Sequence, residues 1–143
     1  MKKLKQVLLA DDDKANNFLN VCLLEEMGIA EEITVLLNGK EALEYLLAPE
    51  ADDKPPPELV ILDHLMPVMD GLELMRELYR TGFTERKEVV FLLLAAHSSP
   101  KAIEEFKRLG VQEYTTKPLS EEVVLRAWQK YLAYDTAGNH SAK

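Results

Sequence analysis

Short apolar runs alternate along the chain with longer segments in which apolar residues recur every three or four positions. Most of the short runs have no polar residue inside them, as is typical of strands that are buried on both faces of a sheet. The predicted strands cover residues 7–10, 33–37, 59–62, 89–94 and 111–116. The last of them is the most polar, so we expect it at an edge of the sheet.

The segments between the predicted strands carry helix start signals. Asn38 with Glu41, and Asp70 with Glu73, have the spacing of a capping box, and Ser120 is a favourable N-cap before two acidic residues. The predicted helices cover residues 16–27, 38–47, 70–80, 100–110 and a final segment from residue 120. Strands and helices that alternate in this way predict an α/β fold, a parallel sheet with helices on both faces.

Apolar residues at helical spacing predict which faces of two helices pack inward. In the first helix they include Phe18, Val21 and Leu24. In the last helix Trp128 shares this spacing with Tyr131, which fits either core packing or a surface for a partner.

Length and composition favour one domain. The chain has 143 residues, 47% of them hydrophobic, which is enough for a single core. We expect a domain over residues 1–134 and a polar C-terminal tail over residues 135–143. An acidic, proline-rich segment over residues 49–58 is expected to be a variable connection.

Charge and apolar run length exclude several kinds of partner. The net charge of -8 argues against direct nucleic-acid binding and against an anionic membrane surface. The longest apolar run, residues 89–96, is far shorter than the roughly 20 residues of a membrane span. A single cysteine, Cys22, offers no disulfide framework. These features predict a cytoplasmic protein.

Charged residues follow three of the predicted strands. Asp11, Asp12 and Asp13 come after the first, Asp63 after the third and Lys117 after the fifth. The carboxyl ends of parallel strands meet at one edge of the sheet, which is where ligands bind in this fold class. Two carboxylates about 5 Å apart repel by roughly 3 kcal/mol at an effective dielectric of about 20, so a cluster of them needs a cation.

Magnesium fits such a cluster, because it prefers oxygen ligands and retains several waters. A carboxylate beside Mg²⁺ and an ammonium group is a competent nucleophile toward a phosphoryl group, since both cations spread the transferred charge. The sequence therefore predicts phosphoryl chemistry at this edge of the sheet.

Three segments resemble the signature of the response regulator receiver domain of two-component systems. They are Val-Leu-Leu-Ala-Asp-Asp-Asp at 7–13, Leu-Asp-His-Leu-Met-Pro-Val-Met-Asp-Gly at 62–71 and Lys-Pro-Leu at 117–119. The resemblance covers about residues 4–133. It implies a flavodoxin-like, doubly wound, five-stranded parallel sheet of order 2-1-3-4-5 with five helices.

The resemblance also implies a role for each residue of the acidic cluster. Asp63 is expected to accept the phosphoryl group, Asp12 to bind Mg²⁺ directly and Asp11 to bind it through water. The backbone carbonyl of Leu65 is expected to supply another ligand. Asp13 is expected to support the acidic loop rather than to bind metal.

Further positions are implied by the third motif and by the strand that precedes it. Lys117 is expected to pair with the phosphoryl oxygens, and Pro118 to follow a cis peptide bond. Tyr114 matches the aromatic switch residue of the family. Ala95 stands where receivers carry serine or threonine, and its methyl group cannot donate a hydrogen bond to the phosphoryl group. We therefore expect weaker coupling between phosphorylation and shape.

Two residues near the expected site bear on how long the phosphoryl group lasts, and a third follows the phosphoacceptor. Leu65 and His97 occupy positions that tune hydrolysis in the family. Leu65 cannot orient an attacking water, so we expect slow dephosphorylation, whereas His97 either orients a water or has no role. His64 is expected to point away from Asp63, to the opposite face.

The leading hypothesis is a signalling module that is not an enzyme. It would accept a phosphoryl group from a histidine kinase or histidine phosphotransfer protein. We expect no output domain, so the module would act on a downstream protein target by contact. The alternative is a degenerate receiver that binds without switching, which Ala95 favours. A third hypothesis, a haloacid-dehalogenase-type phosphatase, fits poorly because residues 11–15 lack the threonine or valine of that motif.

Overall fold

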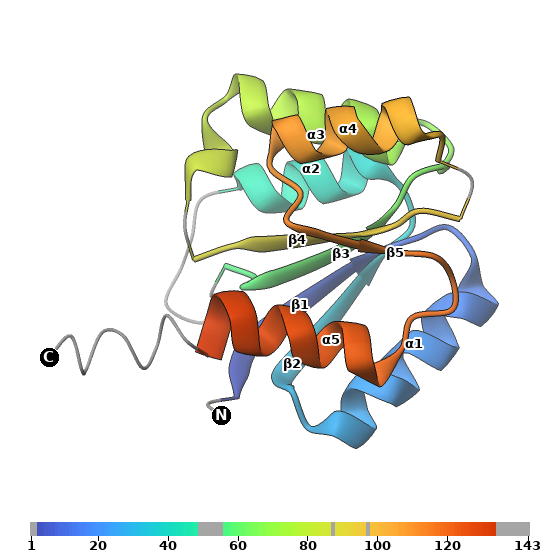
Figure 1. The fold of residues 1–143 in the computed structure, drawn as a ribbon, viewed down its shortest axis with the longest axis vertical. Coiled ribbons are helices and arrows are strands. Elements are labelled where there is room, and N and C mark those ends of the chain that lie inside the picture. Colours follow the sequence, from blue (N-terminus) through green and yellow to red (C-terminus); the bar gives the residue numbers. More distant parts are fainter. Residues whose placement is uncertain (1–2, 49–55, 87, 97, 134–143) are drawn as a thin grey trace, which may run out of the picture.

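The computed structural model of the protein describes residues 3–48, 56–86, 88–96 and 98–133 (Figure 1). Most of the proline-rich segment, His97 and the polar tail over residues 135–143 lie outside the described residues.

A sheet of five parallel strands forms the middle layer of the described chain (Figure 1). The strands are β1 (Leu4–Ala10), β2 (Ala30–Leu36), β3 (Leu59–Asp63), β4 (Val90–Leu94) and β5 (Glu113–Thr115). Their order is β2-β1-β3-β4-β5, and every neighbouring pair is parallel. The predicted fold and the edge position of the last strand are confirmed.

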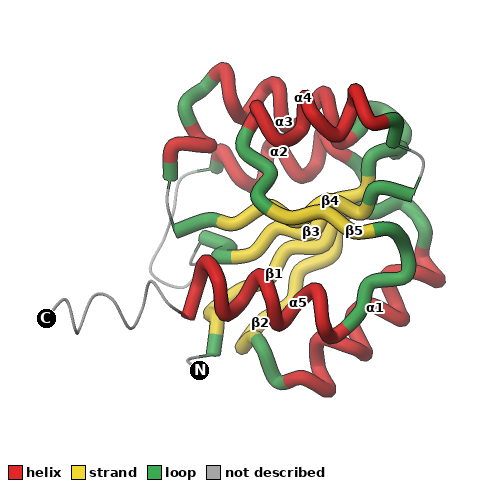
Figure 2. The backbone as a smooth tube through the Cα atoms, viewed as in Figure 1, coloured by secondary structure: helices red, strands yellow, loops and turns green. Residues whose placement is uncertain are grey.

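Helices cover both faces of the sheet, with α2, α3 and α4 on one face and α1 and α5 on the other (Figure 2). Their bounds are α1 (Lys14–Met27), α2 (Gly39–Leu47), α3 (Gly71–Arg80), α4 (Pro100–Leu109) and α5 (Glu121–Ala127). A short 3-10 turn (Phe83–Glu85) follows α3, and a π-helical segment (Trp128–Ala133) continues α5. The predicted helix starts at Asn38, Asp70 and Ser120 are confirmed as N-caps.

Two cores lie between the sheet and its helix layers. One contains Leu62 of β3 with Phe106 of α4, and the other contains Ile61 of β3 with Val124 of α5. Neighbouring residues of β3 thus enter opposite cores, because side chains alternate across a strand. Trp128 is 7% exposed and belongs to the second core, so core packing is the correct interpretation of this residue.

Two elements differ from the pattern that the sequence predicts. Strand β2 begins at Ala30, earlier than predicted, and exposes Glu31 and Glu32. Both glutamates are tolerated because β2 lies at the edge of the described sheet, next to β1. In α1, Phe18 is 69% exposed, so its prediction as a packed residue is wrong.

The packed face of α1 is partly polar, which explains the exposed phenylalanine. Asn17 and Asn20 are buried in place of Phe18. The side-chain amide of Asn17 donates a hydrogen bond of 2.8 Å to the backbone carbonyl of Asp11. This contact ties the first turn of α1 to the residue that follows β1. Across the described ranges, none of the helices is both long and apolar enough to cross a membrane.

Candidate functional site

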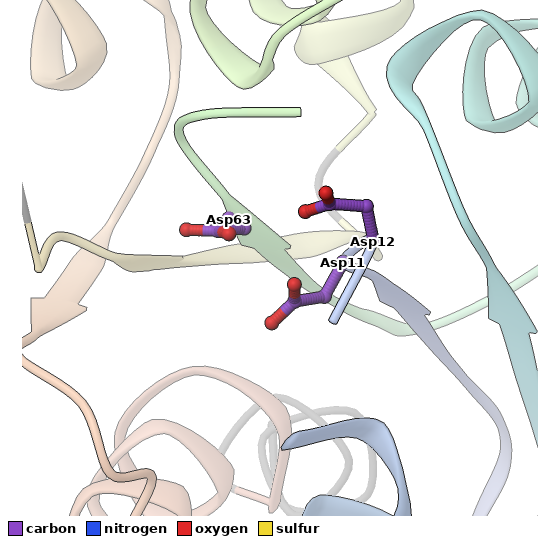
Figure 3. A group of neighbouring side chains, drawn as sticks. All are labelled: Asp11, Asp12 and Asp63. Carbon is purple, nitrogen blue, oxygen red and sulfur yellow. The ribbon is translucent and has the colours of Figure 1, made fainter. Parts of the chain in front are cut away.

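Three carboxylates meet at the carboxyl edge of the sheet, as predicted. Asp11 directly follows β1 and Asp63 ends β3, and these strands are neighbours with Ala10 opposite Leu62. Asp12 is the next residue of the β1–α1 loop. The nearest ligand oxygens of Asp11, Asp12 and Asp63 all lie within 4.8 Å of one another (Figure 3).

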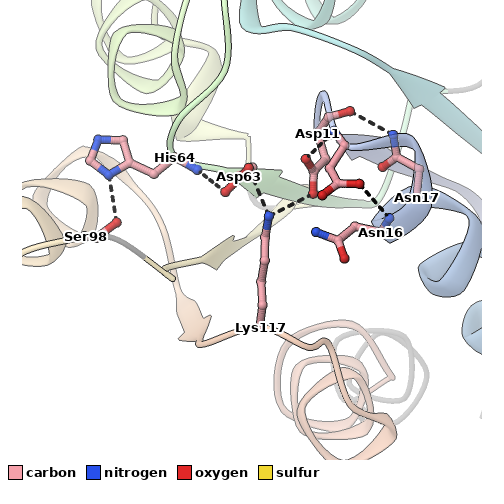
Figure 4. Close-up of polar contacts among 8 residues, drawn as sticks. Asp11, Asn16, Asn17, Asp63, His64, Ser98 and Lys117 are labelled. Atoms are coloured by element: carbon pink, nitrogen blue, oxygen red, sulfur yellow. Dashed lines mark hydrogen bonds and ion pairs between the residues drawn. The ribbon is translucent and has the colours of Figure 1, made fainter.

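Lys117 brings a positive charge into this cluster (Figure 4). Its Nζ donates a hydrogen bond of 3.2 Å to Asp63 Oδ2 and lies 3.3 Å from Asp11 Oδ2. The residue follows β5, and the peptide bond to Pro118 is cis, as predicted. One ammonium group therefore compensates two of the three carboxylates.

Burial makes this arrangement electrostatically demanding. Asp11 is 1% exposed, and burial raises the pKa of its carboxyl group against the lowering effect of the Asp13 amide. The charge of Asp63 raises that pKa further, and Lys117 lowers it. Burial lowers the pKa of the Lys117 ammonium group. The hydrogen bond to Asp63 and the negative charges of Asp63 and Asp11 outweigh this effect, so the pKa of Lys117 is raised. The site therefore carries an excess of negative charge.

The acidic cluster fits a divalent cation. Asp11 Oδ2 is buried and accepts no hydrogen bond within the described residues, although the Lys117 ammonium lies close by. A buried carboxylate oxygen is costly unless a positive charge satisfies it, and here the Lys117 ammonium is shared between Asp11 and Asp63. Three carboxylates that converge beside open solvent at Asp12 are the ligand type that Mg²⁺ prefers.

The loop after β1 is built to hold Asp11 in place. The Asp13 amide donates a hydrogen bond of 2.9 Å to Asp11 Oδ1, and Asp13 Oδ1 accepts one of 3.1 Å from the Asn16 amide. Asp13 is thus the N-cap of α1, as expected for a residue that supports the loop. Sequence reasoning missed Asn17, because a buried asparagine has no periodic signature.

The loop after β3 is equally constrained. The His64 amide donates a hydrogen bond of 2.8 Å to Asp63 Oδ1, and the Gly71 amide donates one of 2.7 Å to the His64 carbonyl. Val68 adopts a left-handed backbone with φ of 70°, which is strained for a β-branched residue. Leu65 and Val68 are 53% and 75% exposed, so the rim of the site is apolar here.

The two expected switch positions lie on β4 and β5 or directly after them. Ala95 follows β4 and is 5% exposed, and its backbone amide donates a hydrogen bond of 2.7 Å to the Thr115 carbonyl. Its methyl group brings no hydroxyl to the site. Tyr114 on β5 is 42% exposed, and Lys107 Nζ lies 5.1 Å from its ring centroid. This cation–π contact holds the ring on the outer surface.

The side chain of His64 leaves the acidic cluster and turns toward α4 (Figure 4). Its Nδ1 lies 2.7 Å from Ser98 Oγ, a hydrogen bond between the β3–α3 and β4–α4 loops. The ring packs edge-on against Phe106, with centroids 5.0 Å apart. Sequence reasoning predicted that His64 points away from Asp63 but missed Ser98 as its partner.

Comparison with known proteins agrees with this geometry. The profile of the response regulator receiver domain family matches residues 7–129. Response regulator Rcp1 of Synechocystis is 32% identical over 114 residues, which are 79% of this chain and 76% of that protein. The crystal structure of a two component response regulator from Cytophaga hutchinsonii has a TM-score of 0.76 at 29% identity, covering 92% of this chain and 98% of that one.

Another solved structure shares the fold and contains a metal ion. The receiver domain of the sensor histidine kinase PA1611 from Pseudomonas aeruginosa has a magnesium ion coordinated in its active site cleft. It has a TM-score of 0.68 at 22% identity and covers 89% of this chain and 96% of that one, a likeness that shows the fold.

Proposed function

Because the chain belongs to the response regulator receiver domain family, we propose that it accepts a phosphoryl group on Asp63 with Mg²⁺ bound alongside. The observation that carries this proposal is the contact of Lys117 Nζ with Asp63 Oδ2 at 3.2 Å, inside a cluster of three carboxylates. A nucleophilic carboxylate, an ammonium group and an acidic metal site are the parts that phosphoryl transfer requires.

The reaction forms one bond and breaks another. A carboxylate oxygen of Asp63 attacks the phosphorus atom of a phosphohistidine, and the phosphorus–nitrogen bond breaks. The imidazole nitrogen of the donor keeps the electron pair and takes a proton from solvent. Lys117 stabilises the charge of the transferred oxygens, and the His64 amide fixes the attacking carboxylate through Oδ1.

The metal would be held by residues from two loops. Asp12 and Asp63 would bind it directly, Asp11 through water, and the Leu65 backbone carbonyl would add a ligand. When bound, Mg²⁺ supplies positive charge to the phosphoryl oxygens. The buried Asp11 oxygen, which shares the Lys117 ammonium with Asp63, and the magnesium ion of the Pseudomonas receiver domain support this assignment.

The phosphoryl donor would be a histidine kinase or a histidine phosphotransfer protein of a two-component phosphorelay. The output would be contact with a downstream protein target, without direct binding to nucleic acid, because the net charge is -8. We place the receiver domain at residues 1–134, with residues 135–143 as a polar tail, in a cytoplasmic protein.

A degenerate receiver is the second candidate, and Ala95 favours it. In that case the module binds its partner regardless of phosphorylation, and the switch positions Ala95 and Tyr114 do not respond. Beryllium fluoride with Mg²⁺ mimics the phosphoryl group and separates the two functions. A changed environment of Tyr114, read by NMR, supports a switching receiver, and an unchanged one supports the degenerate module.

Acetyl phosphate tests the phosphoacceptor directly. With Mg²⁺, the wild-type protein should gain one phosphoryl group by intact mass, and Asp63→Asn should gain none. Asp13→Asn is the matched control, because Asp13 lies in the same acidic region but caps α1. Labelling of Asp63→Asn as complete as that of the wild type would reject Asp63 as the acceptor.

A further inference from the structure

The β4–α4 loop has one hydroxyl that reaches the phosphoacceptor loop, and it belongs to Ser98. Ala95 has no hydroxyl, and Ser99 Oγ already accepts the Ala102 amide at 3.1 Å as the N-cap of α4. Ser98 Oγ instead lies 2.7 Å from His64 Nδ1. Among the described residues of this loop, Ser98 is thus the side-chain link to the site.

His64 contacts both the phosphoacceptor and this loop. Its backbone amide donates to Asp63 Oδ1 at 2.8 Å, while its side chain holds Ser98 and lies against Phe106. Phe106 is fully buried in the core beneath α4, with 0% exposure. A displacement of the His64 backbone therefore moves a ring that is packed against α4.

We propose that His64 is a positioning residue that couples phosphorylation of Asp63 to the β4–α4 loop through Ser98. The inference rests on the proposed function, and it goes beyond it by naming the route that the signal takes. This route replaces the contact that a hydroxyl at position 95 would have made.

The coupling follows from the chemistry of the carboxylate. Phosphorylation turns one Asp63 oxygen into the bridging oxygen of an acyl phosphate and the other into a neutral carbonyl oxygen, and both are weaker acceptors than a carboxylate oxygen. The hydrogen bond from the His64 amide to Asp63 Oδ1 is then no longer charge-assisted. The phosphoryl oxygens also compete with Asp63 as acceptors for this amide. The contact between the His64 amide and Asp63 thus differs between the unphosphorylated and phosphorylated states. It therefore shifts the conformational equilibrium of the elements that contact His64.

The attached elements are the loop and the start of α4. The backbone amide of Ser98 donates a hydrogen bond of 3.3 Å to the Ala95 carbonyl, and the next residue, Ser99, is the N-cap of α4. Movement of Ser98 therefore changes the first turn of α4. The middle of this helix is held independently, because Arg76 of α3 pairs with Glu105 through two hydrogen bonds of 2.8 and 3.0 Å.

The experiment compares amide NMR spectra with and without beryllium fluoride and Mg²⁺. The amides of Asp12 and Lys117 report occupancy of the site, and those of residues 98–106 report the loop and α4. In Ser98→Ala, we expect the site response to remain while the response of residues 98–106 falls below half of the wild-type value. Ser98→Thr, which keeps the hydroxyl, should restore it.

Glu105→Gln is the matched control for a structural effect. It weakens the attachment of α4 to α3 without touching His64 or Ser98, so the response of the loop to beryllium fluoride should persist. A full loop response in Ser98→Ala, with the site occupied, overturns the proposed route alone. A wild-type protein whose Asp12 and Lys117 amides do not respond overturns the proposed function and the inference with it.

Discussion

Gly71 lies against Asp63 so closely that a Cβ atom on Gly71 would stand 2.2 Å from the Asp63 backbone carbonyl oxygen. Any larger residue must push apart the end of β3 and the start of α3. We predict that Gly71→Ala lowers the free energy of unfolding by about 1–3 kcal/mol, the usual cost of overpacking. The initial rate of phosphorylation by acetyl phosphate should also fall, because Asp63 is displaced.

Gly28→Ala is the control for this prediction. Gly28 needs a left-handed backbone with φ of 61°, but nothing lies within 4 Å of its Cβ position. Gly28→Ala should therefore lose stability and keep the phosphorylation rate per folded molecule. Equal rates in the Gly71 variant and the wild type would contradict a steric role for Gly71 at the site.

Magnesium should raise the melting temperature of the protein. A ligand that binds only the folded state stabilises it by RT ln(1 + [L]/Kd), about 2.7 kcal/mol at 100 times Kd. Asp12→Ala should remove most of the rise that millimolar Mg²⁺ produces. In Asp13→Ala, the loss of the α1 cap costs about 1 kcal/mol, but the response to Mg²⁺ should survive. Melting curves that are the same with Mg²⁺ and with a chelator would argue against a metal site.

The phosphorylated form should be long-lived for a receiver. Leu65 is 53% exposed, and its side chain offers no hydrogen bond to a water that attacks the phosphorus atom. A Leu65→Asn substitution should shorten the lifetime, measured by loss of the phosphoryl mass after removal of the donor. Val68→Asn, in the same loop, should leave the lifetime unchanged. A lifetime in Leu65→Asn that matches or exceeds the wild-type value would show that hydrolysis is controlled elsewhere.

The left-handed backbone of Val68 should cost stability. The φ of 70° brings the Cβ of a β-branched residue close to the backbone, at about 1–2 kcal/mol. Asparagine tolerates this conformation, so Val68→Asn should raise the free energy of unfolding by about 1 kcal/mol in a urea titration. Val68→Ile keeps the branch and should gain nothing. A gain of equal size in both variants would point to an effect other than backbone strain.

The sheet and the acidic cluster could be predicted from the sequence because their signals are local. Uninterrupted apolar runs mark β3 and β4, where every residue is buried, and the charges that follow each strand must meet at one edge. The order of the strands came from the resemblance to the family. The positions of Asp11, Asp63 and Lys117 agree with the prediction from the local signals and from the resemblance to the family.

Other features depend on contacts that no local pattern encodes. His64 and Ser98 are 34 positions apart and meet only because two loops lie over neighbouring strands. Asn17 is buried because it binds the backbone beneath it, so Phe18 is left at the surface against the periodicity of α1. The φ of Val68 also has no sequence signal, since β-branched residues normally avoid that region.

The two exposed glutamates at the start of β2 also protect the protein from self-assembly through its sheet. Among the strands that the structure describes, β2 pairs with β1 alone, so its other side presents unpaired backbone groups to a second chain. Two copies paired in parallel and in register along this edge would bring Glu31 and Glu32 of one close to those of the other. Each like-charge pair at about 4 Å costs about 1 kcal/mol even in water. Aggregation by strand addition at β2 is therefore opposed by charge, most strongly at low salt.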